Sequence, residues 1–446
     1  MCTFLLRSEF GTREVKMYVR RLKIRDLRVF RTAEVDLLYP GREQNESFED
    51  VSRWPPRLDN VNVFLGNNGS GKSTLLSAVA LSLMSPIAPS SGYRPRSLIR
   101  RSARGQVKSA EVSTEVVLHQ QDGGRDGNAS TFAAQILRRG DIEFLQPSTD
   151  VVDEQFFEDD NSAFFFVGYG ATRRTEVLSA NDLASRRKAR AVRYERVASL
   201  FEEHFALTPI SAWLPRWRDE NPGRYKQVAN LLKRLMPPSI SFTEELEGGE
   251  YLFGYRTLRL PYSALSDGYR LYIGWIGDLL YHLCMGAPSG FKLVESRGVV
   301  MVDEVDLHIH PAWQRTLIPT LSRTLKNIQF IFTTHSPLLV STLERSNIYN
   351  VMLGSGPTPE VRRPEEETFG LSADQLLRSE VFGLDSSRDP EFADKLRDLS
   401  QAAERGERGA ALAFLRGASA GGGEDPPEAG DAPEWLKSFG ERSKAL

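Results

Sequence analysis

Apolar and polar residues alternate along two short stretches near the N-terminus, 22–25 and 34–37. A period of two predicts two half-buried strands that form a hairpin or a meander. After a polar loop, the apolar stretch VNVFLG ends at Gly66, and a glycine-containing loop and an apolar helical stretch, 75–84, follow it. This part of the chain therefore predicts the order strand, glycine loop, helix.

The pattern changes after residue 90. Residues 91–110 hold six basic side chains and no acidic one, whereas residues 150–160 are strongly acidic. Short strands return on both sides of the turn at Gly248 and Gly249, and a helix is predicted from about residue 269 to residue 285. The region between the two patterned parts is therefore expected to be an insertion.

Two later apolar runs, 299–302 and 328–332, predict buried strands of a mainly parallel sheet. Residues 1–16 precede the first regular pattern and are either an upstream extension or an expression scar. We expect an N-terminal lobe (17–90), an inserted, mixed and mainly helical region (91–239), a C-terminal lobe (240–353), a helical extension (354–416) and a flexible tail (417–446).

Composition indicates an ordered protein. The chain has 446 residues, of which 40% are hydrophobic, enough for a packed core. The 57 basic and 59 acidic residues leave a net charge of −2, so any affinity for nucleic acid must be local. The most apolar long stretch, 271–287, is interrupted by Asp278 and His282, so no membrane span is expected. Only two cysteines are present, which suits a reducing compartment and predicts a cytoplasmic protein.

The glycine loop carries the clearest chemistry. Gly66, Gly71, Lys72 and Ser73 match the pattern G-x-x-x-x-G-K-[ST]. Glycines let backbone N–H groups turn inward around a phosphate, and the following helix adds its positive N-terminus. The lysine of such a loop reaches the β- and γ-phosphates, and the hydroxyl binds Mg²⁺. The pattern therefore predicts a nucleotide site.

A carboxylate pair, Asp303 and Glu304, ends the apolar run VVMVDE. The carboxyl end of a parallel strand is where an α/β sheet holds its ligand. We expect Asp303 to hold Mg²⁺ through coordinated waters and Glu304 to polarise the attacking water as a general base. A strand-end pair of this kind also occurs without function, so the neighbouring motifs decide between the two interpretations.

Two further segments are ambiguous by themselves. Ser266, Asp267 and Gly268 begin a helix, and they form either a second phosphate-binding surface or an ordinary N-terminal cap. His335 follows the strand IQFIFTT, where its ring could contact a γ-phosphate or make a structural hydrogen bond. His308 and His310 lack a third ligand cluster, which argues against zinc.

In this order, GNNGSGKST, ALSDG, VVMVDEVDLHIHPAWQ and FIFTTHSP resemble the Walker A, signature, Walker B with D-loop, and switch-histidine motifs of ABC-type ATPase heads of the SMC and RecF class. The chain is most similar to the "AAA family" ATPases that include the OLD nucleases and the PtuA subunit of the Septu antiviral system. GYGATRR (168–174) and the segment 368–384 resemble the same group, so the resemblance covers most of residues 17–390. It implies an α/β P-loop NTPase head with a mixed or parallel sheet flanked by helices.

The resemblance also implies roles for individual residues. ATP and Mg²⁺ would lie in a head-to-tail sandwich of two copies, closed by Ser266, Asp267 and Gly268 of the partner subunit. Glu304, Lys72 and His335 would be catalytic, Asp306 would communicate across the interface, and Ser73 and Asp303 would hold the metal. The remaining expected nucleotide contacts are Arg28, Asn67, Asn68, Gly69, Ser70, Gly71, Lys72, Ser73 and Thr74.

Some features depart from this pattern. The signature reads LSDG rather than LSGGQ, with Tyr269 at the glutamine position, and Gln135 is only a candidate for the Q-loop glutamine. No long heptad arm and no TOPRIM nuclease segment are visible, so any nuclease activity would belong to a partner. The absence of N-K-x-D favours adenine over guanine.

These observations lead to one main hypothesis. We expect a homodimer, or a higher oligomer, that hydrolyses ATP to gate a separate nuclease or toxin in antiviral defence or another DNA-linked process. The alternatives are the ATPase subunit of a membrane transporter and a scaffold in which ATP is structural. The basic runs 94–108 and 186–196 either contact DNA or RNA or are solvated surfaces that pair with the acidic stretch 150–160.

Overall fold

The computed structural model describes residues 16–49, 51, 53–102, 105–119, 129–147, 165–175, 192–287, 290–353, 356 and 358–419. The expectations for residues 1–15, for the acidic stretch 150–160, for 186–191 and for 420–446 lie outside the described residues. The chain divides into two compact units, 1–382 and 383–446. The nucleotide motifs all lie in the first unit.

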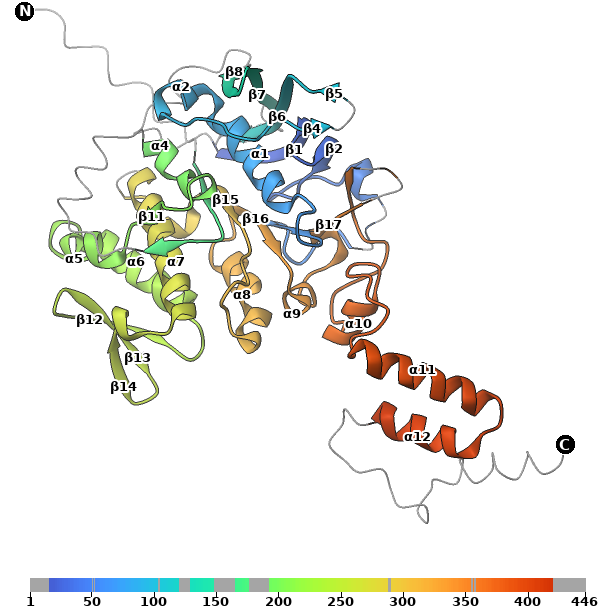
Figure 1. Cartoon of the computed structure of the whole chain (residues 1–446). Helices are drawn as coiled ribbons and strands as arrows, with labels where there is room; N and C mark the ends of the chain where they lie inside the picture. The colour runs from blue at the N-terminus through green and yellow to red at the C-terminus, as the bar shows by residue number, and fades with distance from the viewer. Residues whose placement is uncertain are drawn as a thin grey trace, which may run out of the picture. The chain divides into compact units, whose positions relative to one another are not determined.

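A six-stranded sheet forms the centre of the first unit (Figure 1). Its strands run parallel except β18, which pairs antiparallel with β17 at one edge. This confirms the expected buried, mainly parallel sheet. Their order across the sheet is β18 (Pro359–Arg362), β17 (Ile348–Leu353), β3 (Val61–Leu65), β16 (Ile328–Thr334), β15 (Gly298–Val302) and β9 (Phe166–Tyr169).

The two faces of this sheet belong to two different hydrophobic cores. Val300 and Val302 on β15 pack into one core, and Val299 and Met301 pack into the other, because successive strand residues point to opposite faces. The first core is shared with the helices α5 (Ile210–Glu220), α6 (Pro222–Leu235), α7 (Asp267–Gly286) and α8 (Pro311–Thr324). Further short helices are α2 (Ala88–Ser91), α4 (Val192–Glu195), α9 (Pro337–Val340) and α10 (Ala373–Arg378).

The second core contains helix α1 (Lys72–Met84), in which Ser73 is the one residue that is not buried. An apolar helix of this kind needs cover on every side. The central sheet covers one side of α1, and a five-stranded antiparallel sheet covers the other. That second sheet has the order β2 (Phe30–Asp36), β1 (Lys16–Leu27), β6 (Ser109–His119), β7 (Ala129–Arg139) and β8 (Ile142–Pro147).

The expected hairpin near the N-terminus is confirmed as β1 and β2. The expected mainly helical insertion at 91–239 is not confirmed as such. Its described part contains the strands β6 to β8, which complete the sheet begun by β1, and β9, which joins the central sheet. Helices α5 and α6 lie in its last third. Short strands in this part are β4 (Arg101–Ser102), β5 (Gly105–Gln106), β10 (Arg174–Thr175) and β11 (Ala206–Leu207).

The C-terminal elements differ from the prediction at one boundary. A three-stranded sheet, β12 (Ser241–Glu247), β13 (Glu250–Tyr255) and β14 (Leu258–Pro261), confirms the short strands around Gly248. The expected helical extension was placed from residue 354, but β18 still belongs to the central sheet. The second unit begins at Gly383, and its described part is a helical hairpin, α11 (Pro390–Glu404) with α12 (Arg408–Ser419).

Candidate nucleotide-binding site

Three neighbouring strands bring the predicted motifs to one edge of the central sheet. β3 leads into the glycine loop, β16 leads into His335, and β15 leads into Asp303. The three strands are adjacent and parallel, in the order β3, β16, β15. Their carboxyl ends therefore share one edge, which is where open α/β sheets bind ligands.

The glycine loop has the backbone that a phosphate-binding loop needs. Gly66, Gly69 and Gly71 all have positive φ, at 155°, 78° and 107°. A Cβ on Gly66 would lie 2.2 Å from the carbonyl oxygen of Val351, and one on Gly71 would lie 2.5 Å from the ring of Phe30. Only glycine fits at these two positions.

Lys72, the first residue of α1, is buried inside this loop. Its Nζ donates to the carbonyl oxygens of Gly66, at 2.9 Å, and Asn67, at 3.0 Å. Burial lowers the pKa of Lys72, and the charges of the nearby carboxylates Asp303, Glu304 and Asp306 partly offset that effect. The lysine and the Walker B carboxylates therefore form one electrostatic cluster, as the motifs predict.

Two threonines at the end of β16 organise these carboxylates. The Thr333 hydroxyl donates to Asp303 Oδ1 at 2.5 Å and accepts from the backbone N–H of Glu304 at 2.7 Å. Thr334 donates to Asp306 Oδ1 at 2.5 Å. Neither threonine was among the expected site residues, although both stand in the quoted segment FIFTTHSP.

His335 lies at the same edge, directly after Thr334. Burial and the charge of Lys72 lower its pKa, while Asp306 and the other two carboxylates act in the opposite direction. The ring is therefore neutral at pH 7. It has no hydrogen-bond partner among the described residues, so the structural role considered from the sequence finds no support in these contacts.

Ser73 and Asp303 suit a magnesium ion that ATP helps to hold. Ser73 is exposed, and Asp303 Oδ2 has no hydrogen-bond partner among the described residues. No three His, Cys, Asp or Glu side chains within the described ranges gather closely enough to hold a metal by themselves. This donor set fits Mg²⁺, which keeps waters and shares its ligands with nucleotide phosphates.

The signature segment forms the start of α7. Ser266 occupies the N-cap position, but its side chain makes no capping hydrogen bond, and the residue is exposed. Asp267 is also exposed and pairs with Arg270, which lowers the pKa of Asp267. A Cβ on Gly268 would lie 2.3 Å from the carbonyl oxygen of His308 in the D-loop. Signature and D-loop therefore pack together within one chain.

Arg28 lies in the turn between β1 and β2, beside the glycine loop. Its backbone has φ of 47°, its N–H donates to Leu98 O at 2.6 Å, and its side chain is exposed. The next two residues, Val29 and Phe30, pack directly against Gly71. The turn thus places Arg28 next to residues that touch the loop, and its contact with a nucleotide stays a prediction. The proposed contacts of Asn67, Asn68, Ser70 and Thr74 lie on the same loop and first helical turn.

Two other predictions from the sequence differ from what the structure shows. Gln135 lies on β7 in the five-stranded sheet, where its amide donates to Glu111 at 3.4 Å, so it is not part of this edge. In the second basic run, Arg193 and Arg196 are buried at 1% and 3% exposure. The interpretation of that run as a nucleic-acid surface is therefore wrong at these two positions.

Arg173 was not among the site residues expected from the sequence. This residue follows β9, the neighbour of β15, and its side chain is only 3% exposed. Its two terminal nitrogens donate to the carbonyl oxygens of Asp303 and Glu304. The only signal in the sequence was the segment GYGATRR, to which no role had been given.

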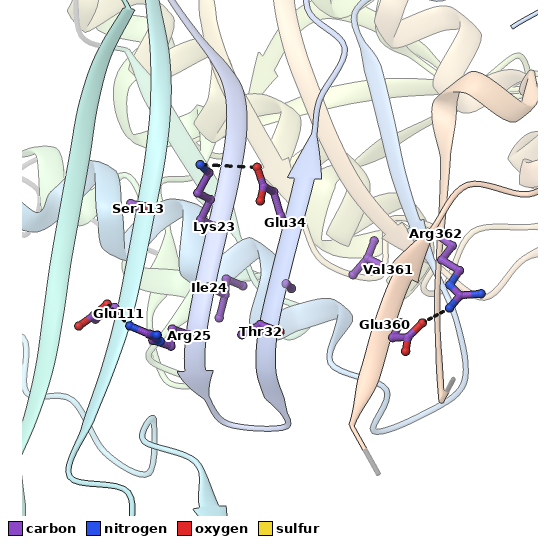
Figure 2. A pocket seen from close by; sticks show the side chains of 11 residues that line it. Lys23, Ile24, Arg25, Thr32, Glu34, Glu111, Ser113, Glu360, Val361 and Arg362 are labelled. Carbon is purple, nitrogen blue, oxygen red and sulfur yellow. Dashed lines mark hydrogen bonds and ion pairs between the residues drawn. The ribbon is translucent and has the colours of Figure 1, made fainter. Parts of the chain in front are cut away.

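A separate hollow of about 580 Å³ lies where β1 and β2 face the edge strand β18 (Figure 2). Its charged side chains pair with one another, as Lys23 does with Glu34 at 3.6 Å. None of the predicted site residues lines it.

Among the helices of the described residues, none combines the length and the apolar character needed to cross a membrane.

Comparison with known families decides the classification. The family model described as "AAA domain, putative AbiEii toxin, Type IV TA system" matches residues 61–341, which is more than half of the chain. The chain belongs to this family. The matched range of this AAA domain begins with β3 and ends after His335, so it contains all four motifs. This confirms the resemblance to SMC-like and PtuA-type AAA ATPases.

Several known proteins are similar to this chain. It is 24% identical to the Septu protein PtuA of Bacillus mycoides (strain KBAB4) over 72% of this chain and 40% of that protein. It is 42% identical to the "Retron Ec83 probable ATPase" of Escherichia coli over 35% of this chain and 29% of that protein. The chain thus covers less than half the length of these two relatives.

Among solved structures, the SMC head domain from Thermotoga maritima aligns with 78% of this chain and 99% of its own, at 15% identity and a TM-score of 0.40. The strand order and the positions of the motifs in the AAA domain identify its fold as a P-loop ATPase head.

Proposed function

We propose that this AAA domain protein hydrolyses ATP and uses the cycle as a switch. The observation that carries the proposal is the cluster at one sheet edge, in which buried Lys72 lies beside Asp303, Glu304 and Asp306. A phosphate loop with its lysine and a strand-end carboxylate pair are parts that P-loop phosphoryl transfer uses, and His335 lies at the same edge.

The roles of the residues follow from their positions. The loop N–H groups and Lys72 would bind the β- and γ-phosphates, while Ser73 and the waters held by Asp303 would complete the shell of Mg²⁺. The metal would neutralise phosphate charge. Glu304 would accept the proton of the attacking water, and His335 would donate a hydrogen bond to the γ-phosphate.

The proposed dimer rests on the exposed signature segment. Ser266 sits at a helix N-terminus with a hydroxyl that caps nothing, and Asp267 beside it is exposed. Such a surface can accept a phosphate from outside its own chain. We infer that Ser266, Asp267 and Gly268 of the partner subunit close on ATP held by the loop of the first, with Asp306 next to the interface.

The effector and the process belong to the same proposal. Relatives are named for Septu and retron systems, and the family description names a toxin–antitoxin system. These names favour a prokaryotic defence role in which the ATP cycle gates a separate nuclease or toxin. A homodimer, or a higher oligomer built from it, would present the effector.

The first test compares phosphate release by the wild type, Lys72→Ala and Glu304→Gln. Loss of one preorganised charge donor typically lowers turnover about 10²- to 10³-fold, which is the expected result for Lys72→Ala. Glu304→Gln should retain ATP binding and accumulate as a closed dimer. Equal phosphate release by all three proteins would support the ATP-stabilised scaffold instead. Co-purification of the protein with a multispanning membrane protein would support the transporter.

A second candidate function, contact with DNA or RNA, is favoured by a basic groove of about 1110 Å³. Arg94, Arg96 and Arg101 line it, are exposed, and have no ion-pair partner among the described residues. Phe144, also in the lining, is 46% exposed and offers a ring for base stacking. The groove therefore suits a single-stranded nucleic acid.

A fluorescent single-stranded oligonucleotide tests this candidate. Reversing the charge of Arg94, Arg96 and Arg101 together should weaken binding strongly and reduce the salt dependence of the binding that remains, because phosphate contacts release counterions. Arg216→Glu on α5, an exposed arginine outside the groove, is the matched control. Equal binding by both variants would remove the groove as the nucleic-acid site.

A further inference from the structure

Glu304 has an unusual backbone conformation for a residue with a long side chain. Its φ is 47°, in the left-handed region that residues other than glycine seldom occupy. The neighbouring structure must hold such a conformation, and it is found most often where a side chain has to be aimed. Because Glu304 comes two residues after the end of the buried strand β15, its backbone conformation sets the direction in which its carboxylate leaves the sheet.

Contacts on both sides hold this peptide. On the amide side, the Thr333 hydroxyl accepts from the N–H of Glu304 at 2.7 Å. On the carbonyl side, Arg173 Nη2 donates to Glu304 O at 3.0 Å, and Nη1 donates to the carbonyl of Asp303. One guanidinium therefore bridges the two successive carbonyls that flank the start of the left-handed turn.

Arg173 is placed for this contact by the sheet. β9 pairs in parallel with β15, and the backbone N–H of Asp303 donates to Tyr169 O at 2.8 Å. Four residues further on, the Arg173 side chain is 3% exposed, and its Nε has no hydrogen-bond partner. A buried cation is costly unless it is paired or hydrogen-bonded, and the two carbonyl oxygens supply such hydrogen bonds to Arg173. Arg173 therefore does not serve simply as a solvated surface charge.

The charge of Arg173 also suits its surroundings. Burial lowers its pKa to about 10, and Asp303, Asp306 and Glu304 act to raise it, so the guanidinium is charged at pH 7. A lysine would supply a point charge but not the planar fork that reaches two carbonyls at once. Arg173→Lys therefore keeps the positive charge but removes the contact with two carbonyls, so this substitution separates the effect of charge from the effect of geometry.

We propose that Arg173 is a positioning residue for Glu304: its bidentate contact holds the left-handed backbone that aims the Glu304 carboxylate at the attacking water. It acts through Glu304 and does not itself bind ATP. The kinetic part of this inference rests on the proposed ATP hydrolysis, whereas the conformational part does not.

The kinetic test uses Arg173→Lys and Arg173→Gln in the full chain. A misplacement of about 1 Å at a reacting group can lower a rate about 100-fold, so kcat should fall by about that factor in Arg173→Lys. KM for ATP and the equilibrium affinity for a fluorescent ATP analogue should stay within about twofold of the wild type, because the phosphate loop is untouched. A loss of affinity without a loss of kcat would overturn the proposal.

Arg174→Lys is the matched control, because Arg174 is adjacent, basic and exposed. Its kcat should equal that of the wild type. In a Glu304→Gln background, Arg173→Lys should lower the residual rate no further, since the group that it positions is already gone. Additive losses in the double variant would mean that Arg173 acts independently of Glu304.

A crystal structure of Arg173→Gln supplies a readout that does not need turnover. Glu304 should leave the left-handed region or show two backbone conformations. An unchanged Glu304 backbone would overturn the inference even if the variant were inactive. If instead the wild type hydrolyses no ATP, the proposed function fails, while a shifted Glu304 backbone would still support the positioning role. Should Arg173→Gln not fold, the structure of Arg173→Lys decides the point.

Discussion

At the scale of single residues, two glycines of the phosphate loop have different surroundings. Gly71, with φ of 107°, has no room for a side chain, since a Cβ would lie 2.5 Å from Phe30 and 2.7 Å from Val29. Gly69, with φ of 78°, has nothing within 4 Å of a Cβ. Both carry backbone strain on substitution, but only Gly71 adds a steric clash with the β1–β2 turn.

This difference predicts unequal effects of alanine at the two positions. Gly69→Ala should lower the free energy of unfolding by about 1 kcal/mol, which is the cost of a left-handed alanine. Gly71→Ala should lower it by about 2–4 kcal/mol, because overpacking adds to the same strain, and it should weaken ATP binding by moving the turn that carries Arg28. Thermal unfolding and a fluorescent ATP analogue measure both effects. Equal losses at the two positions would contradict the assigned role of the β1–β2 turn.

Residues of the site differ in how far the sequence could reveal them. The positions of Lys72, Asp303 and Glu304 follow from motifs in which the chemistry and the strand-to-loop transition stand within a few residues. Arg173 could not be found in this way, because its partners are carbonyls just after a strand that lies more than a hundred positions later. Its role depends on β9 pairing with β15, and local pattern does not specify which strands become neighbours.

At the scale of elements, α7 is tied to the Walker B strand through a buried carboxylate. Asp278 on α7 accepts from the Tyr169 hydroxyl at 2.9 Å and from the Thr208 N–H at 2.7 Å, and lies 3.3 Å from His282. Tyr169 O in turn accepts from the N–H of Asp303. The signature helix and Asp303 therefore share one hydrogen-bonded connection.

Asp278→Asn should weaken this connection in a pH-dependent way. Burial raises the pKa of Asp278, but His282 and the hydrogen bonds from Thr208 and Tyr169 outweigh it and lower the pKa below its ordinary value. The folded state thus binds fewer protons there than the unfolded chain does. The stabilisation is complete above the unfolded pKa of about 3.9, and it disappears as the pH falls through the folded value.

Urea unfolding followed by tryptophan fluorescence checks this expectation. At pH 7 the variant should lose about 1.5–3 kcal/mol, the usual contribution of hydrogen bonds to a charged group, and below about pH 4 its difference from the wild type should shrink. Glu220→Gln on α5 is the control, because its 54% exposed carboxylate should contribute little at any pH. A constant difference across the pH range would exclude the carboxylate charge as the cause.

The error in the expected insertion also belongs to this scale. Val112, Thr114 and Val116 are buried on β6, with polar residues between them, which is the period of two that identified β1 and β2. The net basic character of 91–110 and the acidic stretch that follows drew the interpretation toward a separate region. The strands of this region instead join the sheet of β1 and β2, where they cover the second side of the apolar helix α1. This is a tertiary contact, which a local sequence pattern does not specify.

At the scale of the whole molecule, the proposed head-to-tail dimer would complete each catalytic site with residues of a second copy. Lys72, Ser73, Asp303 and Glu304 lie at one edge of the central sheet. Exposed Ser266 begins α7, which packs into the first hydrophobic core, whereas α1 packs into the second. A head-to-tail pair would give two sites, each with a loop from one copy and a signature from the other. This arrangement makes a quantitative prediction for mixtures of two inactive variants.

Lys72→Ala destroys the loop half of a site, and Ser266→Arg blocks the signature half. Each variant alone should be inactive, because both sites of its dimer contain the defect. In an equal mixture, about half of the dimers are mixed, and each mixed dimer holds one intact site, so turnover should recover to about a quarter of the wild-type value.

Mixing Lys72→Ala with Ser73→Ala is the control, since two loop defects leave neither site of a mixed dimer intact. Phosphate release measured after both variants have been combined at equal concentration distinguishes the cases. Recovery in the first mixture and none in the second would require that a site is shared between copies. If the first mixture stays inactive although native mass spectrometry shows mixed dimers, then Ser266 does not act on the partner's nucleotide, and the switch must close in another way.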